Sequence, residues 1–314
     1  MTWLAWRQQR TEMLVAALVL GLLAALLVPT GLHMDSVYAH DHLAACVTQP
    51  KGNCGIAINS FDHRFEHLGG LLAWLNLVPG LLGILLAAPF VLELEHGTFR
   101  LAWTQSLTRR RWLSTKLALI GFGALAAALG MTVLMTWWRA PLDHLHGRMA
   151  QNVFDFEGVV PFAYIVFAVA LVIAIGVVLR RTVLAIGLAS IGYLALRLSV
   201  QTWIRQNYVA PVRRVWPVGQ PGPGHLDTAW NLQSGSSDRY GHPLANADTI
   251  FATCARGPTR LDSACARAHG IYNLAVFQPA SRFWLFQGIE TAIFGGLALI
   301  LLAIAVWWTQ KRVS

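Results

Sequence analysis

The stretch Gly158–Leu179, GVVPFAYIVFAVALVIAIGVVL, decides the fold of this chain. It contains no Asp, Glu, Lys or Arg, and the pair Arg180-Arg181 follows it directly. A helix of about 20 apolar residues is long enough to cross the hydrocarbon core of a bilayer. An apolar run of this length is typical of a membrane-spanning helix.

The composition extends this interpretation to the whole chain. Of 314 residues, 55% are hydrophobic and 12% are charged, which is about half the charged share of a soluble domain. The first apolar run is longer than that of a signal peptide, so we expect it to be retained. This pattern excludes a soluble enzyme, a nucleic-acid-binding domain and a disordered protein. The predicted spans are 13–32, 69–92, 117–138, 158–179, 183–203 and 284–308.

The distribution of charge predicts the orientation. Arg and Lys are concentrated in the short loops after the second and fourth spans and beside both termini. Cytoplasmic loops of membrane proteins carry such an excess of cations. We therefore expect both termini in the cytoplasm of a prokaryote, with the chain as a multi-pass protein of the plasma membrane.

The predicted fold class is all-α, in three parts. Residues 1–204 hold five spans, residues 205–283 form an outer lobe, and residues 284–314 hold the sixth span and a cytoplasmic tail. The lobe is rich in Pro, Gly and Asn, which predicts an irregular segment with little regular structure.

All four cysteines lie on the predicted outer side of the membrane, where disulfides form and persist. Four cysteines allow three pairings. We favour Cys46 with Cys54 and Cys254 with Cys265, because each pair closes a short loop. A pairing between the two loops stays open as an alternative.

The loop between the second and third spans carries the most informative pattern. It lies in Glu93–Lys116, ELEHGTFRLAWTQSLTRRRWLSTK. Gly97 can end a helix in the left-handed conformation, and Thr98 can cap a short amphipathic helix after it. Ser106 or Thr108 can then cap a basic helix. A positively charged loop that only sets topology stays open as an alternative, but such a loop needs neither these helix signals nor the apolar Phe99, Leu101 and Trp103 in its middle. The stretch therefore predicts docking in a groove of another protein.

In this stretch the chain resembles the permeases of type-2 ATP-binding-cassette (ABC) exporters. The resemblance rests on the run E-x-E-x-G-T, the later Thr-Arg pair and a Lys at the start of the next span, and Thr2–Arg10 is similar to their interfacial elbow helix. In that family this loop is a coupling helix that docks on a separate ATPase subunit. The resemblance assigns this role to Glu93, Glu95, Gly97, Thr98, Arg100, Trp103, Arg109, Arg110 and Arg111.

The resemblance implies a non-catalytic permease that works as a dimer of permeases, with two ATPase subunits. The chain has no G-x-x-x-x-G-K-[ST] loop, so ATP and Mg²⁺ are expected on the partner. The implied activity is export of a hydrophobic or amphipathic substrate, such as a drug, a peptide antibiotic or a lipid. The chain departs from the family in Gln105, where many members have Pro, and in its larger lobe.

Two ionisable residues interrupt the predicted spans. Arg197 and Glu290 each lie six residues inside a Trp at the outer end of a span, so their depths match. A charge inside the membrane calls for a partner, which predicts an Arg197–Glu290 ion pair. The pair either locks two helices together, the favoured interpretation, or lines a translocation pathway. Residues on the same helical faces are Tyr193, Gln201 and Gln287.

The outer loops are rich in His, and His63-Arg64-Phe65-Glu66-His67 matches the zinc-protease pattern H-x-x-E-H. The sequence shows no clear third ligand, so interfacial His residues are the preferred interpretation. Metal binding at His40, His42, His63 and His67 stays open as an alternative. A third class of function is a membrane-anchored sensor or scaffold, which binds a ligand through the lobe and needs no ATPase.

Overall fold

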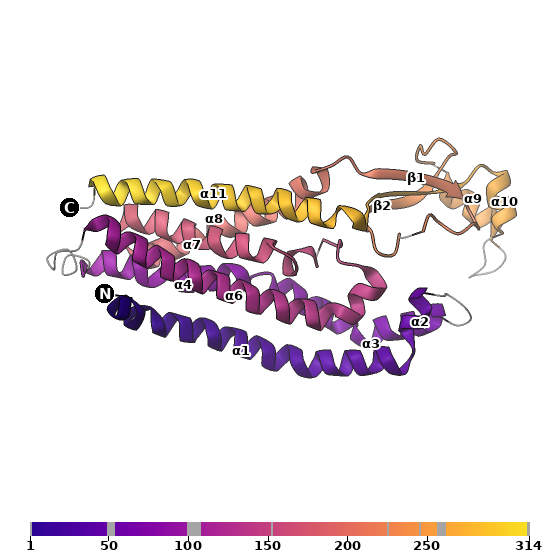
Figure 1. Ribbon diagram of the computed structural model, residues 1–314. Helices are drawn as coiled ribbons and strands as arrows, with labels where there is room; N and C mark the ends of the chain where they lie inside the picture. The colour runs from indigo at the N-terminus through magenta and orange to yellow at the C-terminus, as the bar shows by residue number, and fades with distance from the viewer. Residues whose placement is uncertain are drawn as a thin grey trace.

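The helices of the chain form an elongated bundle in the computed structural model. Both termini lie at one end of the bundle and the lobe lies at the other (Figure 1). We call these the terminal end and the lobe end. The structure describes residues 2–48, 54–98, 108–151, 153–224, 226–244, 246–255 and 262–312.

Within the described residues, six helices are long and apolar enough to cross a membrane. The chain is therefore a multi-pass membrane protein, as the sequence predicts. These helices are α1 (Thr2–His40), α4 (Val78–His96), α6 (Arg109–His146), α7 (Val160–Leu179), α8 (Thr182–Ser199) and α11 (Phe283–Arg312).

The predicted second span, 69–92, is wrong at its start. A separate helix, α3 (Cys54–Leu75), ends before α4 begins at Val78. Pro79 stands in the first turn of α4. Backbone N–H groups in a first turn have no partner within the helix, so a proline there costs no hydrogen bond. The apolar run therefore contains the end of one helix and the start of another.

Two helices run well past their predicted spans. α1 reaches His40 and α6 reaches His146, and both contain a proline, Pro29 and Pro141. At 1.5 Å per residue they are about 58 and 57 Å long. Apolarity marks the part of a helix inside the bilayer, and a helix can continue beyond it.

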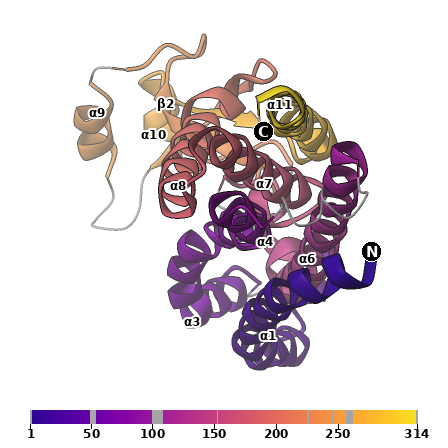
Figure 2. The ribbon, with the colours of Figure 1, turned by 90° about the vertical axis from the view of Figure 1, so that its left-hand side faces the viewer.

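α4 and α7 lie in the middle of the bundle, with α1, α6, α8 and α11 around them (Figure 2). They are also the most buried of the six candidate spans. Gly83 of α4 permits their close approach, because a Cβ there would lie 2.6 Å from the carbonyl oxygen of Ile165 and from Ala168 Cβ. Small residues at such contacts are typical of helix packing in membranes.

The lobe corrects the prediction of an all-α chain with an irregular outer segment. It holds an antiparallel sheet of β1 (Val212–Pro217), β2 (Trp230–Ser237) and β3 (Tyr272–Gln278), in the order β1-β3-β2. The β-branched and aromatic residues of YNLAVFQ indicate the central strand. The abundance of Pro, Gly and Asn in the connections conceals this signal.

Both predicted disulfides are present. Cys46, in α2 (Leu43–Thr48), is bonded to Cys54 at the start of α3. Cys254 and Cys265 join α9 (Ala247–Cys254) to α10 (Ser263–Ala268). Both bonds lie at the lobe end (Figure 1).

Replacing Gly83 by Ala should destabilise the bundle by about 1–3 kcal/mol, because the added methyl group meets the backbone of α7. Gly187→Ala in α8 is the matched control, since a Cβ there meets nothing within 4 Å. Thermal unfolding of the purified protein in detergent measures both. Equal midpoints for the two variants would contradict the close packing of α4 on α7.

Candidate functional site

α4 ends and α6 begins at the terminal end (Figure 1). We call the connection between them the α4–α6 turn. α4 ends at Gly97, whose φ of 69° is left-handed, a conformation that glycine adopts without steric cost. α6 begins behind Thr108, whose Oγ1 accepts a hydrogen bond from the Arg111 backbone N–H at 3.4 Å. Of the two predicted caps, the structure therefore shows Thr108.

Two carboxylates of α4 hold neighbouring helices at this end. Glu93 bonds to Lys116 of α6, and both side chains are largely buried. Glu95 accepts a hydrogen bond at 2.8 Å from the backbone N–H of Thr182, the first residue of α8. A carboxylate is favourable at a helix N-terminus because free N–H groups and the helix dipole meet there. α4 is thus bonded to both α6 and α8.

The other residues assigned to coupling divide into two sets. Thr98 donates to the Glu93 carbonyl oxygen at 3.4 Å, and Arg110 and Arg111 are exposed at the start of α6. Outside the described residues lie Arg100, Trp103, the side chain of Arg109 and the predicted amphipathic helix over 99–105.

A group of charged side chains is buried at the lobe end, between α7, α8 and α11. Arg205 pairs with Glu290 through two hydrogen bonds, Nε to Oε2 at 2.8 Å and Nη2 to Oε1 at 2.7 Å. Arg205 also bonds to Asp155. The Tyr164 hydroxyl lies 2.7 Å from Asp155 Oδ1 and bonds to Glu290 as well. Bidentate pairs of this kind are among the strongest hydrogen-bonded contacts in proteins.

Arg197 belongs to the same group but does not pair with Glu290, so that prediction is wrong. Its Nη2 lies 3.2 Å from Asp155 Oδ2 and donates to Asn76 Oδ1 at 2.6 Å. Its guanidinium also stacks over the Tyr164 ring, 4.4 Å from the centroid. We call Asp155, Tyr164, Arg197, Arg205 and Glu290 the buried charge cluster. Its two arginines and two carboxylates are formally neutral in sum.

The sequence does not predict that Arg205 belongs to the cluster, because the helix geometry changes locally before it. It stands eight residues after Arg197, whereas an α-helix places positions i and i+7 on one face. The structure has a π turn over Val200–Ile204, in which the Arg205 N–H bonds to the Val200 carbonyl. A π turn holds one extra residue, so Arg205 takes the place of position i+7. Asp155 is missed because it lies in a loop between spans.

The other predicted intramembrane residues contact neighbouring elements. Gln287 is buried, and its Oε1 accepts from the N–H groups of Val159 and Val160, each at 3.0 Å. Tyr193 packs on Gly80, where a Cβ would lie 2.5 Å from the tyrosine ring. The Gln201 carbonyl accepts from the Gln151 side chain at 3.1 Å.

A second ionic group lies in the loop between α6 and α7. Glu157 is buried, 3.8 Å from Arg139 and 3.7 Å from Arg148. Burial, helped by the nearby Asp143, raises the pKa of Glu157 to about 9 against the effect of the two arginines, so it is neutral at pH 7. Burial also acts against charge on Asp155, but the guanidinium groups of the buried charge cluster outweigh it and hold the pKa of Asp155 below its ordinary value.

α4 and α8 are joined at both ends. At the terminal end the bond is between Glu95 and Thr182, and at the lobe end it is between Asn76, two residues before α4, and Arg197. α4 is about 28 Å long. A single helix that is held at each end therefore connects the region beside Gly97 with the buried charge cluster.

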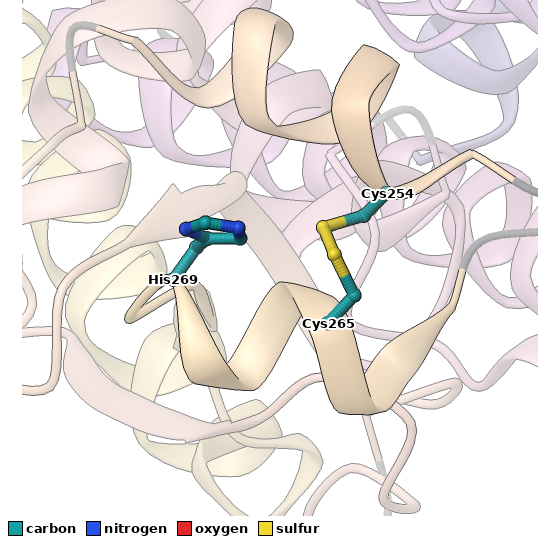
Figure 3. Close-up of side chains that lie close together, drawn as sticks. All are labelled: Cys254, Cys265 and His269. Atoms are coloured by element: carbon teal, nitrogen blue, oxygen red, sulfur yellow. A yellow bond between two sulfur atoms is a disulfide. The ribbon is translucent and has the colours of Figure 1, made fainter.

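The H-x-x-E-H residues form no group of three metal ligands in the described part of the chain. His63 Nδ1 lies 3.6 Å from Glu66 Oε2, and both side chains are exposed. The described residues do bring Cys254, Cys265 and His269 together (Figure 3). The two sulfurs are joined as a disulfide, and metals bind the thiolate form of cysteine.

The sequence model of the ABC-2 membrane transporter related family matches residues 17–205. The chain belongs to this family. No curated protein and no solved structure matched the chain. The matched region of this ABC-2 family member runs from α1 to Arg205 and includes the α4–α6 turn. Membership indicates a membrane component of an ABC transporter, generally non-catalytic, that associates with an ABC ATPase.

Replacing Glu290 by Gln should destabilise the protein by about 3–5 kcal/mol, because it leaves two buried guanidinium groups facing one carboxylate. The double variant Arg205→Met, Glu290→Leu removes both charges and should lose less stability than the sum of its single variants. Thermal unfolding in detergent measures each. Additive losses would contradict a direct interaction between Arg205 and Glu290.

Glu157→Gln should stabilise the protein at pH 8 but hardly at pH 5. A Glu carboxyl ionises near pH 4.3 in an unfolded chain but at about 9 in this fold, so stability falls as the pH rises between these values. Gln imitates the neutral carboxyl and avoids this loss, which is on the order of 2–5 kcal/mol at pH 8. Unfolding midpoints at both pH values test this, and a pH-independent difference would contradict it.

Proposed function

We propose that the chain is the permease subunit of an ATP-driven exporter and moves a hydrophobic or amphipathic substrate out of the cell. The observation that carries the proposal is the α4–α6 turn of an ABC-2 family member, with a helix stop at Gly97, a helix start at Thr108 and exposed cations beside it. ATP and Mg²⁺ bind to a separate ATPase, and the complex has two permeases and two ATPases.

The orientation in this proposal places the terminal end in the cytoplasm. Exposed cations at this end include Arg110, Arg111 and Lys311, in agreement with the excess of cations in cytoplasmic loops. Both disulfides lie at the opposite end, which suits an oxidising exterior. The lobe then caps the exit or selects cargo.

The bonds at the terminal end suggest how ATP hydrolysis drives the membrane helices. The turn docks on the ATPase and moves with it. Glu93 and Glu95 pass this motion to α6 and α8, to which they are bonded, and α4 carries it towards Asn76 and the buried charge cluster. The cluster acts as a lock at the lobe end, because its charges bond to one another across α7, α8 and α11.

The double variant Glu93→Gln, Glu95→Gln tests this coupling. We expect the ATPase subunit to co-purify less well, or the permease-dependent part of its ATPase activity to fall about tenfold, since the buried Glu93–Lys116 bond and the Glu95 bond to α8 are both weakened. Asp35→Asn, an exposed acid at the lobe end of α1, is the matched control. Activity and assembly are measured in lipid nanodiscs.

Two results would contradict the proposal. The first is unchanged assembly and ATPase stimulation in the double variant, which would remove the coupling role from Glu93 and Glu95. The second is a transport-active preparation of this chain that contains no ATPase subunit.

A further inference from the structure

A cavity of about 330 Å³ lies between α3 and α6 at the lobe end, away from the buried charge cluster. We call it the α3–α6 cavity. Phe65 and Leu68 of α3 line it together with Trp138 and Leu142 of α6. Its volume is at the lower end of the range of small-molecule sites, which are mostly apolar with a few placed polar groups.

The polar side of the cavity is acidic. Asp62 and Glu66 contribute two carboxylates to its lining beside Asn59 and His63, and no Lys or Arg is among the described residues that line it. Asp62 also bonds to His146 of α6 at 2.7 Å, which holds α3 beside α6. Glu66 is 77% accessible to solvent, and its contact with the equally exposed His63 is long, at 3.6 Å, so a ligand can reach its carboxylate.

The cavity lies where α6 changes from apolar to charged. Residues 117–138 contain no charged side chain, and Arg139 follows directly. Trp138 is buried, and its indole N–H donates to Thr30 Oγ1 at 3.0 Å, so the ring is held in place by α1. A molecule in the cavity thus has an apolar surface on one side and carboxylates near water on the other.

We propose that the α3–α6 cavity binds a cationic amphiphile. Asp62 and Glu66 hold its ammonium group, and its apolar part contacts Phe65, Leu68 and Leu142. Charge complementarity selects the cation over anionic and zwitterionic analogues. The buried charge cluster offers no such site, since its two arginines pair with its two carboxylates. This inference goes beyond the proposed function and requires neither transport nor an ATPase.

Equilibrium binding of dodecyltrimethylammonium to the full chain in phosphatidylcholine nanodiscs tests the proposal, with empty nanodiscs as the baseline. We expect saturable binding that dodecyl sulfate and dodecylphosphocholine do not share. Glu66→Gln should weaken binding about three- to fivefold, and Asp62→Asn with Glu66→Gln about tenfold. Leu142→Trp, which fills the cavity, should abolish it. The matched control is again Asp35→Asn, an exposed acid at the same end, which should bind like the wild type.

Glu66→Gln is the decisive variant because it leaves the bond between Asp62 and His146 intact, and unchanged unfolding midpoints confirm that the variants are folded. Equal binding of the three amphiphiles would overturn the proposal. So would an effect of Glu66→Gln no larger than that of Asp35→Asn, or full binding by Leu142→Trp. A two-chain cationic lipid in the nanodisc distinguishes the sources of the ligand: competition points to the bilayer, and its absence points to a soluble amphiphile.

Discussion

The lobe end of this protein depends on the mutual neutralisation of charges that water does not reach. Arg205 is fully buried, and an isolated guanidinium there would cost far more than any packing could return. Glu290 and Asp155 accept its hydrogen bonds, and Arg197 balances the second carboxylate. Because these residues come from three helices and a loop, their pairing fixes how α7, α8 and α11 meet.

The same requirement explains why the two ends of the bundle differ. At the terminal end, Glu93 of α4 bonds to a largely buried lysine, and Glu95 bonds to a helix N-terminus near solvent. At the lobe end the contacts are dry and numerous. α4 connects the two regions, since Glu93 and Glu95 lie near its last residue and Asn76 stands two residues before its first.

The sequence predicts what depends on local chemistry and misses what depends on contacts between distant segments. Apolar runs reveal the spans, Gly97 and Thr108 mark the ends of helices, and short loops reveal the disulfides. The break at Asn76 is hidden because apolar residues continue on both sides of it. Arg205 is hidden because a π turn alters the helical phase, and the partner of Arg197 is hidden because Asp155 lies in a loop. Strand β3 is short and stands among turn-forming residues, which dominate the composition of the lobe.

α1 and α6 are longer than a bilayer crossing requires. Both helices are almost twice as long as the hydrocarbon layer is thick, which is about 30 Å. Their uncharged parts end near residues 32 and 138, so about 12 Å of each projects from the bilayer on the side of the lobe. The ends of both helices pack against α2 at the lobe end. A macromolecule that approaches the bundle from that side therefore meets α2 and the polar ends of α1 and α6 before it reaches their uncharged parts.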